Sequence, residues 1–374
     1  MNILLLEPYF TGSHKAWALG YQKYSRHHVE ILSLSGNFWK WRMHGGAISL
    51  AKEFLSGDMQ PDVLVASDML DVTTFLALTR HKTARLPTAV YFHENQLTYP
   101  WSPTDRDIVQ NRDHHYGFIN YVTALAADVV LFNSQYHRDS FNTELKRFLM
   151  HFPDNRAVEN VEIIAEKSFV LPLGLDLSRF DEHKPEQRYS EEPLILWNHR
   201  WEFDKNPEEF YKALFVLAER GLEFQVAVLG ECFSQQPRAF TVAKDILGNR
   251  IVQFGFAENW QDYAAWLWHA DILPVTSHQD FFGASIVEAI YCGCLPLLPK
   301  RLAYPDLIPQ KFHEGVFYED FDDLVIRLET AIGNGGREQC MNLRETIRKY
   351  DWKEIVCQYD DLVENLYRTT HLDN

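Results

Sequence analysis

Short apolar runs recur along the chain, and each is followed by a polar or glycine-bearing turn and then by a helical pattern of apolar positions. Such runs predict buried strands, and their alternation with helices predicts parallel sheets with right-handed crossovers. The first half holds five of these runs, at residues 3–6, 63–66, 89–92, 129–132 and 169–171. The second half holds five more, at residues 194–197, 225–229, 251–254, 272–275 and 295–298.

A polar stretch at residues 181–192 separates the two groups of predicted strands. We therefore expect an α/β protein with two Rossmann-like domains, at 1–180 and 193–350, joined by a linker at 181–192. An amphipathic pattern that begins at residue 351 predicts a terminal helix within 351–374. Ligands bind beyond the carboxyl ends of the strands in open parallel sheets, so the candidate functional residues are those that follow the strands.

The composition excludes several classes of protein. The chain has 374 residues, of which 46% are hydrophobic and 24% charged, which excludes a disordered, collagen-like or coiled-coil chain. No apolar run approaches the ~18 residues that a membrane span needs. Five cysteines without a CxxC pair indicate neither a disulfide framework nor a cysteine zinc site. We expect a cytoplasmic protein that does not associate with membranes.

The charge is distributed unevenly between the two halves. The formal net charge is −16. Lys and Arg number 19 against 22 Asp and Glu in residues 1–190, a net charge of −3, and 17 against 30 in residues 191–374, a net charge of −13. Such a chain is not expected to coat nucleic acid, and only its first half is suited to face a polyanion.

Two cations bracket the turn that follows the first strand of the second half. Arg200 and Lys205 lie five residues apart, near the start of the next helix. Cations at a helix N-terminus favour a phosphate or diphosphate ligand. Taken alone, the pair is explained as well by a solvated loop.

Two carboxylates follow a later strand of the same half. Asp280 precedes Gly283, where a ligand can approach the backbone, and Glu288 lies in the apolar helix that begins there. Carboxylates in such places suit ligands rich in hydroxyl groups, because each oxygen can accept a hydrogen bond from a diol. The alternative is that Asp280 caps the helix and that Glu288 is a surface charge.

These residues resemble the retaining family 4 glycosyltransferases, which have the GT-B fold of two Rossmann-like domains facing each other across a cleft. Arg200 and Lys205 match that family's basic pair on the donor diphosphate. The spacing from Asp280 to Glu288 matches its Glu-x7-Glu motif, with Asp in the first position. The resemblance implies that no metal or cofactor is needed and that Arg200, Lys205 and Asp280 have catalytic roles. It also implies that Asp280 contacts the donor sugar and Glu288 the ribose, and that the helix within 351–374 packs back toward the N-terminal domain. It adds further donor-binding residues at Asn198, Gly255, Phe256, Gly283, Ala284 and Ser285.

The strand ends of the first half carry the remaining candidates. Gly12 and Ser13 lie where the family places a glycine turn against the transferred group, so we assign them to the donor. His93 matches the position of the family's interdomain histidine and is assigned a catalytic role. Glu7 is the only carboxylate in the first strand-end loop, where it could contact the acceptor or orient a backbone turn.

The front half also resembles a narrower family, the tRNA-queuosine α-mannosyltransferases. The segments EPYFTGSHKAW, FWKWRMHGG and YFHENQLTYP carry this resemblance over roughly the first 140 residues. In the second segment, aromatic and cationic side chains alternate in what we expect to be a loop, a pattern suited to stacking on bases, although two core tryptophans would also explain it. The acceptor-binding candidates are Glu7, His14, Lys15, Trp39, Trp41, Arg42, Glu94 and Asn95.

The resemblances imply a retaining enzyme that moves α-mannose from GDP-mannose to queuosine in the anticodon of tRNA-Asp. One alternative is a transferase of the same fold that acts on a cell-envelope glycan or a small molecule, which would not need the aromatic and basic segment at 38–46. A second is a binding protein without activity, against which the intact Arg200, Lys205 and Glu288 count. A glycosidase built on Asp280 and Glu288 leaves the two cations without a role.

Overall fold

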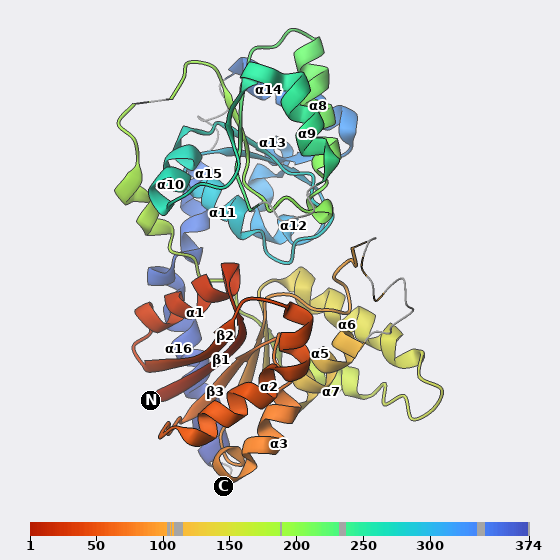
Figure 1. Cartoon of the computed structure of the whole chain (residues 1–374), viewed down its shortest axis with the longest axis vertical. Coiled ribbons are helices and arrows are strands. Elements are labelled where there is room, and N and C mark those ends of the chain that lie inside the picture. Colours follow the sequence, from red (N-terminus) through yellow and green to blue (C-terminus); the bar gives the residue numbers. More distant parts are fainter. Residues whose placement is uncertain are drawn as a thin grey trace. The chain divides into compact units, whose positions relative to one another are not determined.

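The structure is a computed structural model that describes residues 1–102, 105, 107, 115–187, 189–231, 237–334 and 341–372. The chain forms two compact units (Figure 1). Unit 1 comprises Met1–Leu175 together with Trp352–Asn374, and unit 2 comprises Asp176–Asp351. None of the described helices is long and apolar enough to cross a membrane.

Unit 1 is built on a six-stranded parallel sheet with the strand order β2-β1-β3-β4-β5-β6. Its strands are β1 (Asn2–Phe10), β2 (His28–Ser35), β3 (Val63–Ser67), β4 (Thr88–Phe92), β5 (Val129–Phe132) and β6 (Ser168–Val170). Its described helices are α1 (Gly12–Tyr24), α2 (Trp39–Ser56), α3 (Val72–Thr83), α5 (His115–Ala126), α6 (Gln135–Met150), α7 (Asn160–Glu166) and α16 (Trp352–Leu372).

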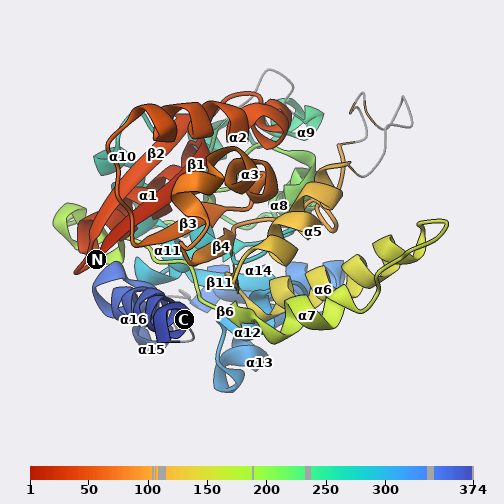
Figure 2. The ribbon, with the colours of Figure 1, turned by 90° about the horizontal axis from the view of Figure 1, so that it is seen from below.

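Side-chain alternation along the strands divides the core of unit 1 between the two faces of its sheet. Leu4 of β1 and Phe92 of β4 point to the same face of the sheet. Leu4 packs there against α2 and α3, and Phe92 packs against α5, α6 and α7. Helix α2 lies beside α3, and α6 lies beside α7 (Figures 1 and 2). Tyr91, which points to the other face, stacks on Trp17 of α1 and on Tyr359 of α16.

Unit 2 is built on a second six-stranded parallel sheet, with the order β12-β11-β10-β7-β8-β9. Its strands are β7 (Leu194–Trp197), β8 (Gln225–Val228), β9 (Ile251–Phe254), β10 (Ile272–Pro274), β11 (Leu295–Pro299) and β12 (Phe317–Tyr318). Its described α-helices are α8 (Pro207–Glu219), α9 (Arg238–Leu247), α10 (Trp260–His269), α11 (Ala284–Tyr291), α12 (Tyr304–Leu307), α13 (His313–Val316), α14 (Phe321–Asn334) and α15 (Met341–Ile347).

The predicted fold class is confirmed, and each of the ten predicted strands overlaps an observed one. Two strands are additional. The sequence does not show β2 as an apolar run, because it is an edge strand with polar residues at several positions. β12 was not predicted because it has only two residues. The segment at 38–46, expected as a loop, instead begins helix α2.

The boundary between the units falls at residue 175, earlier than expected. The 3₁₀ helix η1 (Leu177–His183) is held within unit 2, where the Phe180 carbonyl accepts a hydrogen bond from Trp268 Nε1 at 2.8 Å. Asp181 Oδ2 accepts another from Tyr291 Oη at 2.7 Å. Unit 2 therefore includes residues 176–180 and the stretch 181–192, which the sequence suggested as the end of one domain and a linker.

Helix α16 belongs to unit 1 although it follows unit 2 in the chain. Trp352, its first residue, fills the space above two glycines. A Cβ at Gly20 would lie 2.0 Å from Trp352 Nε1, and one at Gly174 would lie 2.5 Å from Trp352 Cδ2. Tyr359 adds hydrogen bonds, accepting one from Trp17 Nε1 at 3.3 Å and donating to the Pro172 carbonyl at 2.7 Å. Glycine at these positions is thus a packing requirement of the helix.

Candidate functional site

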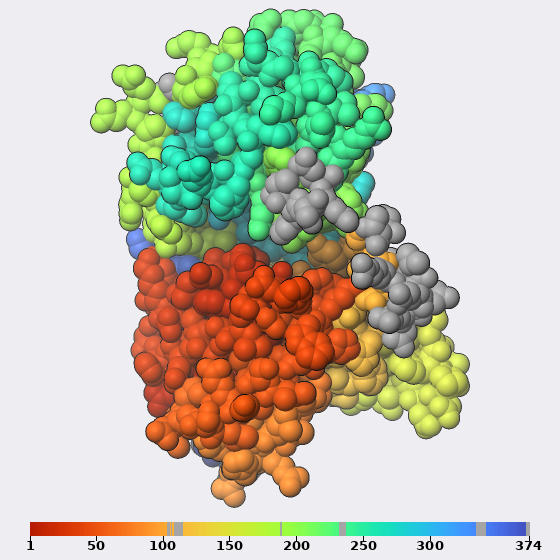
Figure 3. All heavy atoms as spheres, viewed as in Figure 1, coloured from red at the N-terminus to blue at the C-terminus, as the bar shows by residue number. Residues whose placement is uncertain are grey.

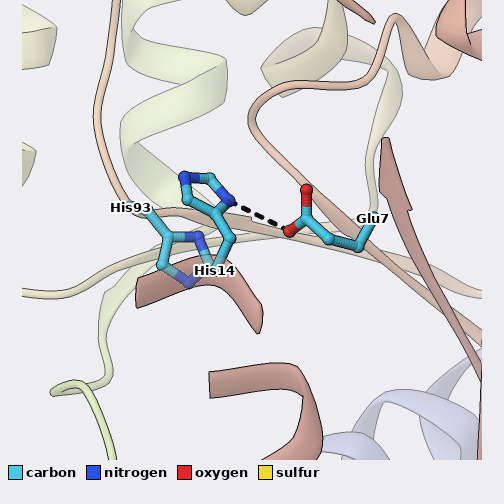
Figure 4. A group of neighbouring side chains, drawn as sticks. All are labelled: Glu7, His14 and His93. Atoms are coloured by element: carbon cyan, nitrogen blue, oxygen red, sulfur yellow. Dashed lines mark hydrogen bonds and ion pairs between the residues drawn. The ribbon is translucent and has the colours of Figure 1, made fainter. Parts of the chain in front are cut away.

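Each unit gathers polar side chains at the carboxyl ends of its strands, and we describe the two sets separately. The set of unit 1 begins with Glu7, a completely buried carboxylate within β1. It accepts a hydrogen bond from the Tyr9 N–H at 2.8 Å and pairs with His14 Nδ1 at 3.0 Å (Figure 4). The structure therefore brings together two of the predicted acceptor-binding residues.

Glu7 and His14 form an ion pair. Burial on its own would raise the pKa of Glu7, but the attraction of His14 outweighs it and lowers that pKa. Burial would likewise lower the pKa of His14, but Glu7 raises it to about 9. At neutral pH the pair is consequently a carboxylate and an imidazolium, with no net charge.

His93 follows β4 and lies against His14. The two rings stack with their centroids 4.1 Å apart and 28° between their planes (Figure 4). Burial, together with the positive charge of His14, lowers the pKa of His93 well below its usual range, so the ring is neutral. Neither of its ring nitrogens has a hydrogen-bond partner among the described residues, and Nδ1 lies 3.5 Å from Asp68 Oδ1. His93 thus offers one donor and one acceptor to a ligand.

Glu7, His14 and His93 each offer a ligand atom within 4.8 Å of the others, as a metal site would. The stacking of the rings argues against a shared ion. A histidine binds a metal through a lone pair in the plane of its ring. An ion shared by the stacked His14 and His93 would lie far out of both ring planes. The arrangement therefore fits hydrogen bonding to a ligand better than metal binding.

Asp68 supports this cluster and was missed by sequence reasoning. It directly follows β3, and its Oδ1 accepts a hydrogen bond from the His93 N–H at 2.8 Å. Asn120 Nδ2 donates to the Asp68 carbonyl at 2.9 Å, and Asn133 Nδ2 donates to the His93 carbonyl at 2.9 Å. Burial raises the pKa of Asp68 to about 7. Its position after an apolar strand was the signal that could have identified it.

The other predicted residues of unit 1 lie at different depths. Gly12, Ser13 and Lys15 are exposed in the first turn of α1. Asn95 is completely buried, and its Oδ1 accepts hydrogen bonds from the backbone N–H groups of residues 97 and 98, so it caps a turn. Glu94 is half-buried and accepts a hydrogen bond from Gln96 Nε2 at 3.0 Å.

The predicted residues of α2 face two ways. Trp39 is half-buried and packs on Tyr116, with ring centroids 5.1 Å apart, whereas Trp41 is exposed. Arg42 donates through Nε to the Ser35 carbonyl at 2.9 Å. Of these three predicted residues, Trp41 and Arg42 are therefore the ones available to a large ligand.

The set of unit 2 centres on Lys205 and Asp280. Lys205 Nζ donates to Asp280 Oδ1 at 2.9 Å and to the Gln279 carbonyl at 2.6 Å, while Tyr304 Oη donates to Asp280 Oδ2 at 2.6 Å. Burial would raise the pKa of Asp280, but Lys205 outweighs it and the pKa is lowered. Arg200 is half exposed and pairs with Glu202 at 3.2 Å. Lys205 thus pairs with Asp280 and Arg200 with Glu202, and the charge of Arg200 still acts on Lys205, whose pKa it lowers in part.

Helix α11 begins beside this pair. Gly283 takes a φ of +93° at the N-cap, a conformation that favours glycine. Asn198 Nδ2 donates to the Ser285 carbonyl at 2.8 Å, and Ser285 Oγ lies 3.0 Å from His199 Nδ1. Since the predicted helix start is observed, its free N–H groups, including that of Ala284, can face an anion.

Glu288 lies one turn into α11. Its Oε2 accepts a hydrogen bond from Tyr263 Oη at 2.7 Å, and burial raises its pKa to about 7. Tyr263 was not predicted from sequence. After β9, Gly255 has a φ of +121° and the ring of Phe256 is exposed. The predicted donor residues of unit 2 thus follow β7, β9 and β10, whereas Gly12 and Ser13 follow β1 in unit 1.

The comparisons with known proteins agree with this division. Residues 2–175 match the family described as tRNA-queuosine alpha-mannosyltransferase N-terminal, and residues 178–350 match glycosyl transferases group 1. The chain is 35% identical to the tRNA-queuosine alpha-mannosyltransferase of Drosophila melanogaster, over 83% of this chain and 82% of that protein.

Solved structures show the same architecture at low identity. Sucrose-phosphate synthase from Thermosynechococcus elongatus superposes with a TM-score of 0.72 at 14% identity, covering 99% of this chain and 100% of that chain. The Anabaena protein Alr3699/HepE in complex with UDP superposes with a TM-score of 0.66 at 15% identity, covering 98% of this chain and 100% of that chain. These likenesses establish the fold alone.

Proposed function

Because the chain belongs to the tRNA-queuosine alpha-mannosyltransferase family of glycosyltransferases, we propose that it moves an α-mannosyl group from GDP-mannose to queuosine in the anticodon of tRNA-Asp. The bond between the anomeric carbon and the diphosphate oxygen breaks, and a bond from that carbon to a queuosine hydroxyl oxygen forms with the α configuration retained. The hydroxyl proton is released with GDP. The proposal also places the protein in the cytoplasm.

The observation that carries the proposal is the set of charges beside α11. Lys205, Asp280 and the start of α11 lie together at the carboxyl ends of β7 and β10. Negative charge grows on the diphosphate as it leaves, and a cation and free helix N–H groups stabilise it. We assign this stabilisation to Lys205, to Arg200 and to the backbone of Ala284 and Ser285.

In this proposal the carboxylates of Asp280 and Glu288 bind the two sugars of the donor. Asp280, held by Lys205 and Tyr304, accepts hydrogen bonds from hydroxyls of the hexose. Glu288, held by Tyr263, accepts them from the ribose. Catalysis proceeds without a metal, because the cations and the helix start supply the positive charge that a metal supplies in other transferases.

The acceptor is assigned to unit 1, whose sequence matches the narrower family. His93 is neutral and has two ring nitrogens without partners among the described residues, so it suits a sugar hydroxyl. The net charge of −16 repels RNA at long range, whereas residues 1–190 carry only −3. Binding of tRNA in this proposal therefore depends on a few local contacts, and its affinity falls only modestly with salt.

A mass-spectrometric assay tests the proposal. The protein is incubated with GDP-mannose and either queuosine-bearing or queuosine-free tRNA-Asp, and the digested nucleosides are weighed. We expect a hexose increment on queuosine alone, and none when UDP-glucose replaces GDP-mannose. If GDP-mannose binds by calorimetry but no increment appears on queuosine, the acceptor assignment is wrong, and a glycan or small-molecule acceptor replaces it.

A further inference from the structure

We propose that Phe38, Trp41 and Arg42, at the start of α2, form a binding surface for an unpaired nucleotide of the tRNA. This inference rests on the proposed function, because it names the part of the acceptor that the surface contacts. The two rings stack on a base, and Arg42 contacts a phosphate. Helix α2 lies on the face of unit 1 that is turned toward the viewer in Figures 1 and 3.

The two rings of this surface are unusually exposed. Phe38 is 79% exposed and Trp41 is 64% exposed. The N–H groups of Trp41 and Arg42 both donate to the Phe38 carbonyl, at 2.8 and 3.1 Å, so the three residues lie within one helical turn. Trp39 between them is half-buried against Tyr116. Two large rings are therefore in water at a place where the neighbouring tryptophan is packed.

The backbone at Phe38 adds a second observation. Phe38 takes the left-handed conformation, with φ +55° and ψ +58°. This conformation is strained for a bulky L-residue, whereas glycine or asparagine adopts it readily. An exposed phenyl ring contributes little to folding that would offset the strain. Such strain is typical of residues retained for function.

Trp41 is fixed in place by a glycine. A Cβ at Gly45 would lie 3.1 Å from both Cε2 and Cζ2 of Trp41, so the indole lies along the helix over Gly45. The neighbouring Gly46 serves the opposite side of the helix, where a Cβ would lie 2.9 Å from Pro8 Cβ. The indole is thus oriented before any ligand arrives, which reduces the entropy lost on stacking.

Arg42 supplies charge complementarity. Its guanidinium donates to the Ser35 carbonyl at 2.9 Å and to Ser35 Oγ at 3.0 Å. No carboxylate of the described residues forms an ion pair with it. Lys40, two residues earlier, is neutralised by Asp105 and Asp107. A held, uncompensated cation beside two exposed rings fits a ligand that joins an aromatic plane to an anion, which is the chemistry of a nucleotide.

The same chemistry indicates which nucleotide is bound. Phe38 and Trp41 offer only ring faces, and stacking on ring faces tolerates any base. Bases inside a duplex are covered by their neighbours, so the rings stack on an unpaired base of a loop or an end, and the proposed acceptor, queuosine, lies in the anticodon loop. We therefore expect a nucleotide of the anticodon loop near queuosine, bound without regard to its identity.

The test measures binding of queuosine-bearing tRNA-Asp to the full chain by fluorescence anisotropy, together with kcat/KM for that tRNA and for the free queuosine nucleoside. Stacking on one ring predicts that Phe38→Ala and Trp41→Ala each weaken tRNA binding by about 10- to 100-fold. The ratio of kcat/KM for tRNA to that for the nucleoside should fall by a similar factor. Trp41→Phe keeps a ring and should stay within a few fold of the wild type.

Two further variants sharpen the test. Leu78→Ala removes an exposed apolar side chain from α3 of the same unit and should leave tRNA binding unchanged. Arg42→Gln should reduce the slope of log Kd against log salt by about 1, as expected for one lost phosphate contact. Equal melting temperatures of the variants and the wild type show that the fold is intact.

Three results would overturn the inference. The first is wild-type tRNA binding in both Phe38→Ala and Trp41→Ala. The second is an equal loss of kcat/KM on tRNA and on the nucleoside. The third is a wild-type dimer that Trp41→Ala dissociates, which would make the surface an interface between copies of this chain. If the wild type binds tRNA but transfers no hexose, the proposed function fails. The binding of tRNA to the Phe38 and Trp41 variants, measured by anisotropy, still decides the role of the rings.

Discussion

Lys205 Nζ lies 2.9 Å from Asp280 Oδ1, so the cation expected to bind the diphosphate is held by the carboxylate expected to bind the sugar. Burial alone would favour the neutral form of both Lys205 and Asp280. The charge of each group offsets this effect and stabilises the charged form of the other. In the proposed function the two halves of the donor are therefore recognised by one coupled pair, and changes at one residue should affect recognition by the other.

Lys205→Ala should lower both turnover and stability. The loss of one charge that stabilises the leaving group is expected to reduce kcat by about 10²–10³-fold. Asp280 would be left without its cation, at a cost of about 1–3 kcal/mol in the free energy of unfolding. Arg200→Ala is the matched variant, since Arg200 is half exposed, and it should lower kcat with little change in stability. Steady-state kinetics and urea denaturation measure both, and normal rates in both variants would remove the donor-site assignment.

Binding of GDP should depend on pH through Glu288. Burial raises the pKa of Glu288 to about 7, so the charged form that accepts hydrogen bonds from the ribose is scarce at pH 6 and dominant at pH 8. The ionised fraction rises about 10-fold over this range, and we expect the affinity for GDP to rise with it. Calorimetry should show that Glu288→Gln removes this rise. An identical pH profile in the variant would contradict the role of Glu288.

The Glu7–His14 pair should make stability depend on pH. The folded protein raises the pKa of His14 from 6.5 to about 9, so the pair contributes fully below pH 6.5, for as long as Glu7 is ionised, and loses its contribution as the pH rises through 9. The shift corresponds to about 3–3.5 kcal/mol. Urea denaturation at pH 6 and pH 10 should show this loss in the wild type and little of it in Glu7→Gln. Glu30→Gln changes an exposed carboxylate of β2 and should keep the wild-type profile.

Transfer should survive removal of metal ions. Arg200, Lys205 and the N–H groups at the start of α11 provide the positive charge for the leaving diphosphate in the proposed mechanism. Turnover in excess EDTA should therefore equal turnover with Mg²⁺ or Mn²⁺. A loss of activity in EDTA that Mg²⁺ or Mn²⁺ restores would show that the mechanism needs an ion.

Gly20→Ala should destabilise unit 1. The added Cβ would lie 2.0 Å from Trp352 Nε1, and overpacking of this kind costs about 1–3 kcal/mol or more. Gly333→Ala in α14 is the matched control. A Cβ there meets nothing within 4 Å, so the higher helix propensity of alanine should leave stability unchanged or raised. Denaturation followed by tryptophan fluorescence compares the two variants, and equal effects would show that Trp352 can move aside.

The strands were largely predictable because parallel sheets bury both faces. A strand such as Val129–Phe132 is a continuous apolar run whose limits are visible in the sequence. The start of α2 was not predictable in the same way. Its two glycines are unfavourable in an isolated helix. Gly46 is explained by a tertiary contact with Pro8, and Gly45 by the Trp41 ring one turn earlier in the same helix.

The site was predictable residue by residue but not pair by pair. Lys205 and Asp280 were both placed at the donor, yet their ion pair joins positions 75 residues apart. Burial of Glu7 could not be inferred either, because a carboxylate after an apolar run indicates that the strand ends there. Asp68 could have been predicted in the same way as His93, since both directly follow an apolar strand.

The place of α16 in the chain has a consequence for the order in which the protein folds. Trp352 and Tyr359 complete the core beside α1, but Asp176–Asp351 is synthesised between them and the rest of unit 1. At typical rates of translation this interval lasts on the order of 10–30 s. During it, Trp17 and Tyr21 lack their partners and leave an aromatic surface exposed on the ribosome-bound chain. Unit 2, whose residues are contiguous, can finish folding first although its synthesis begins later.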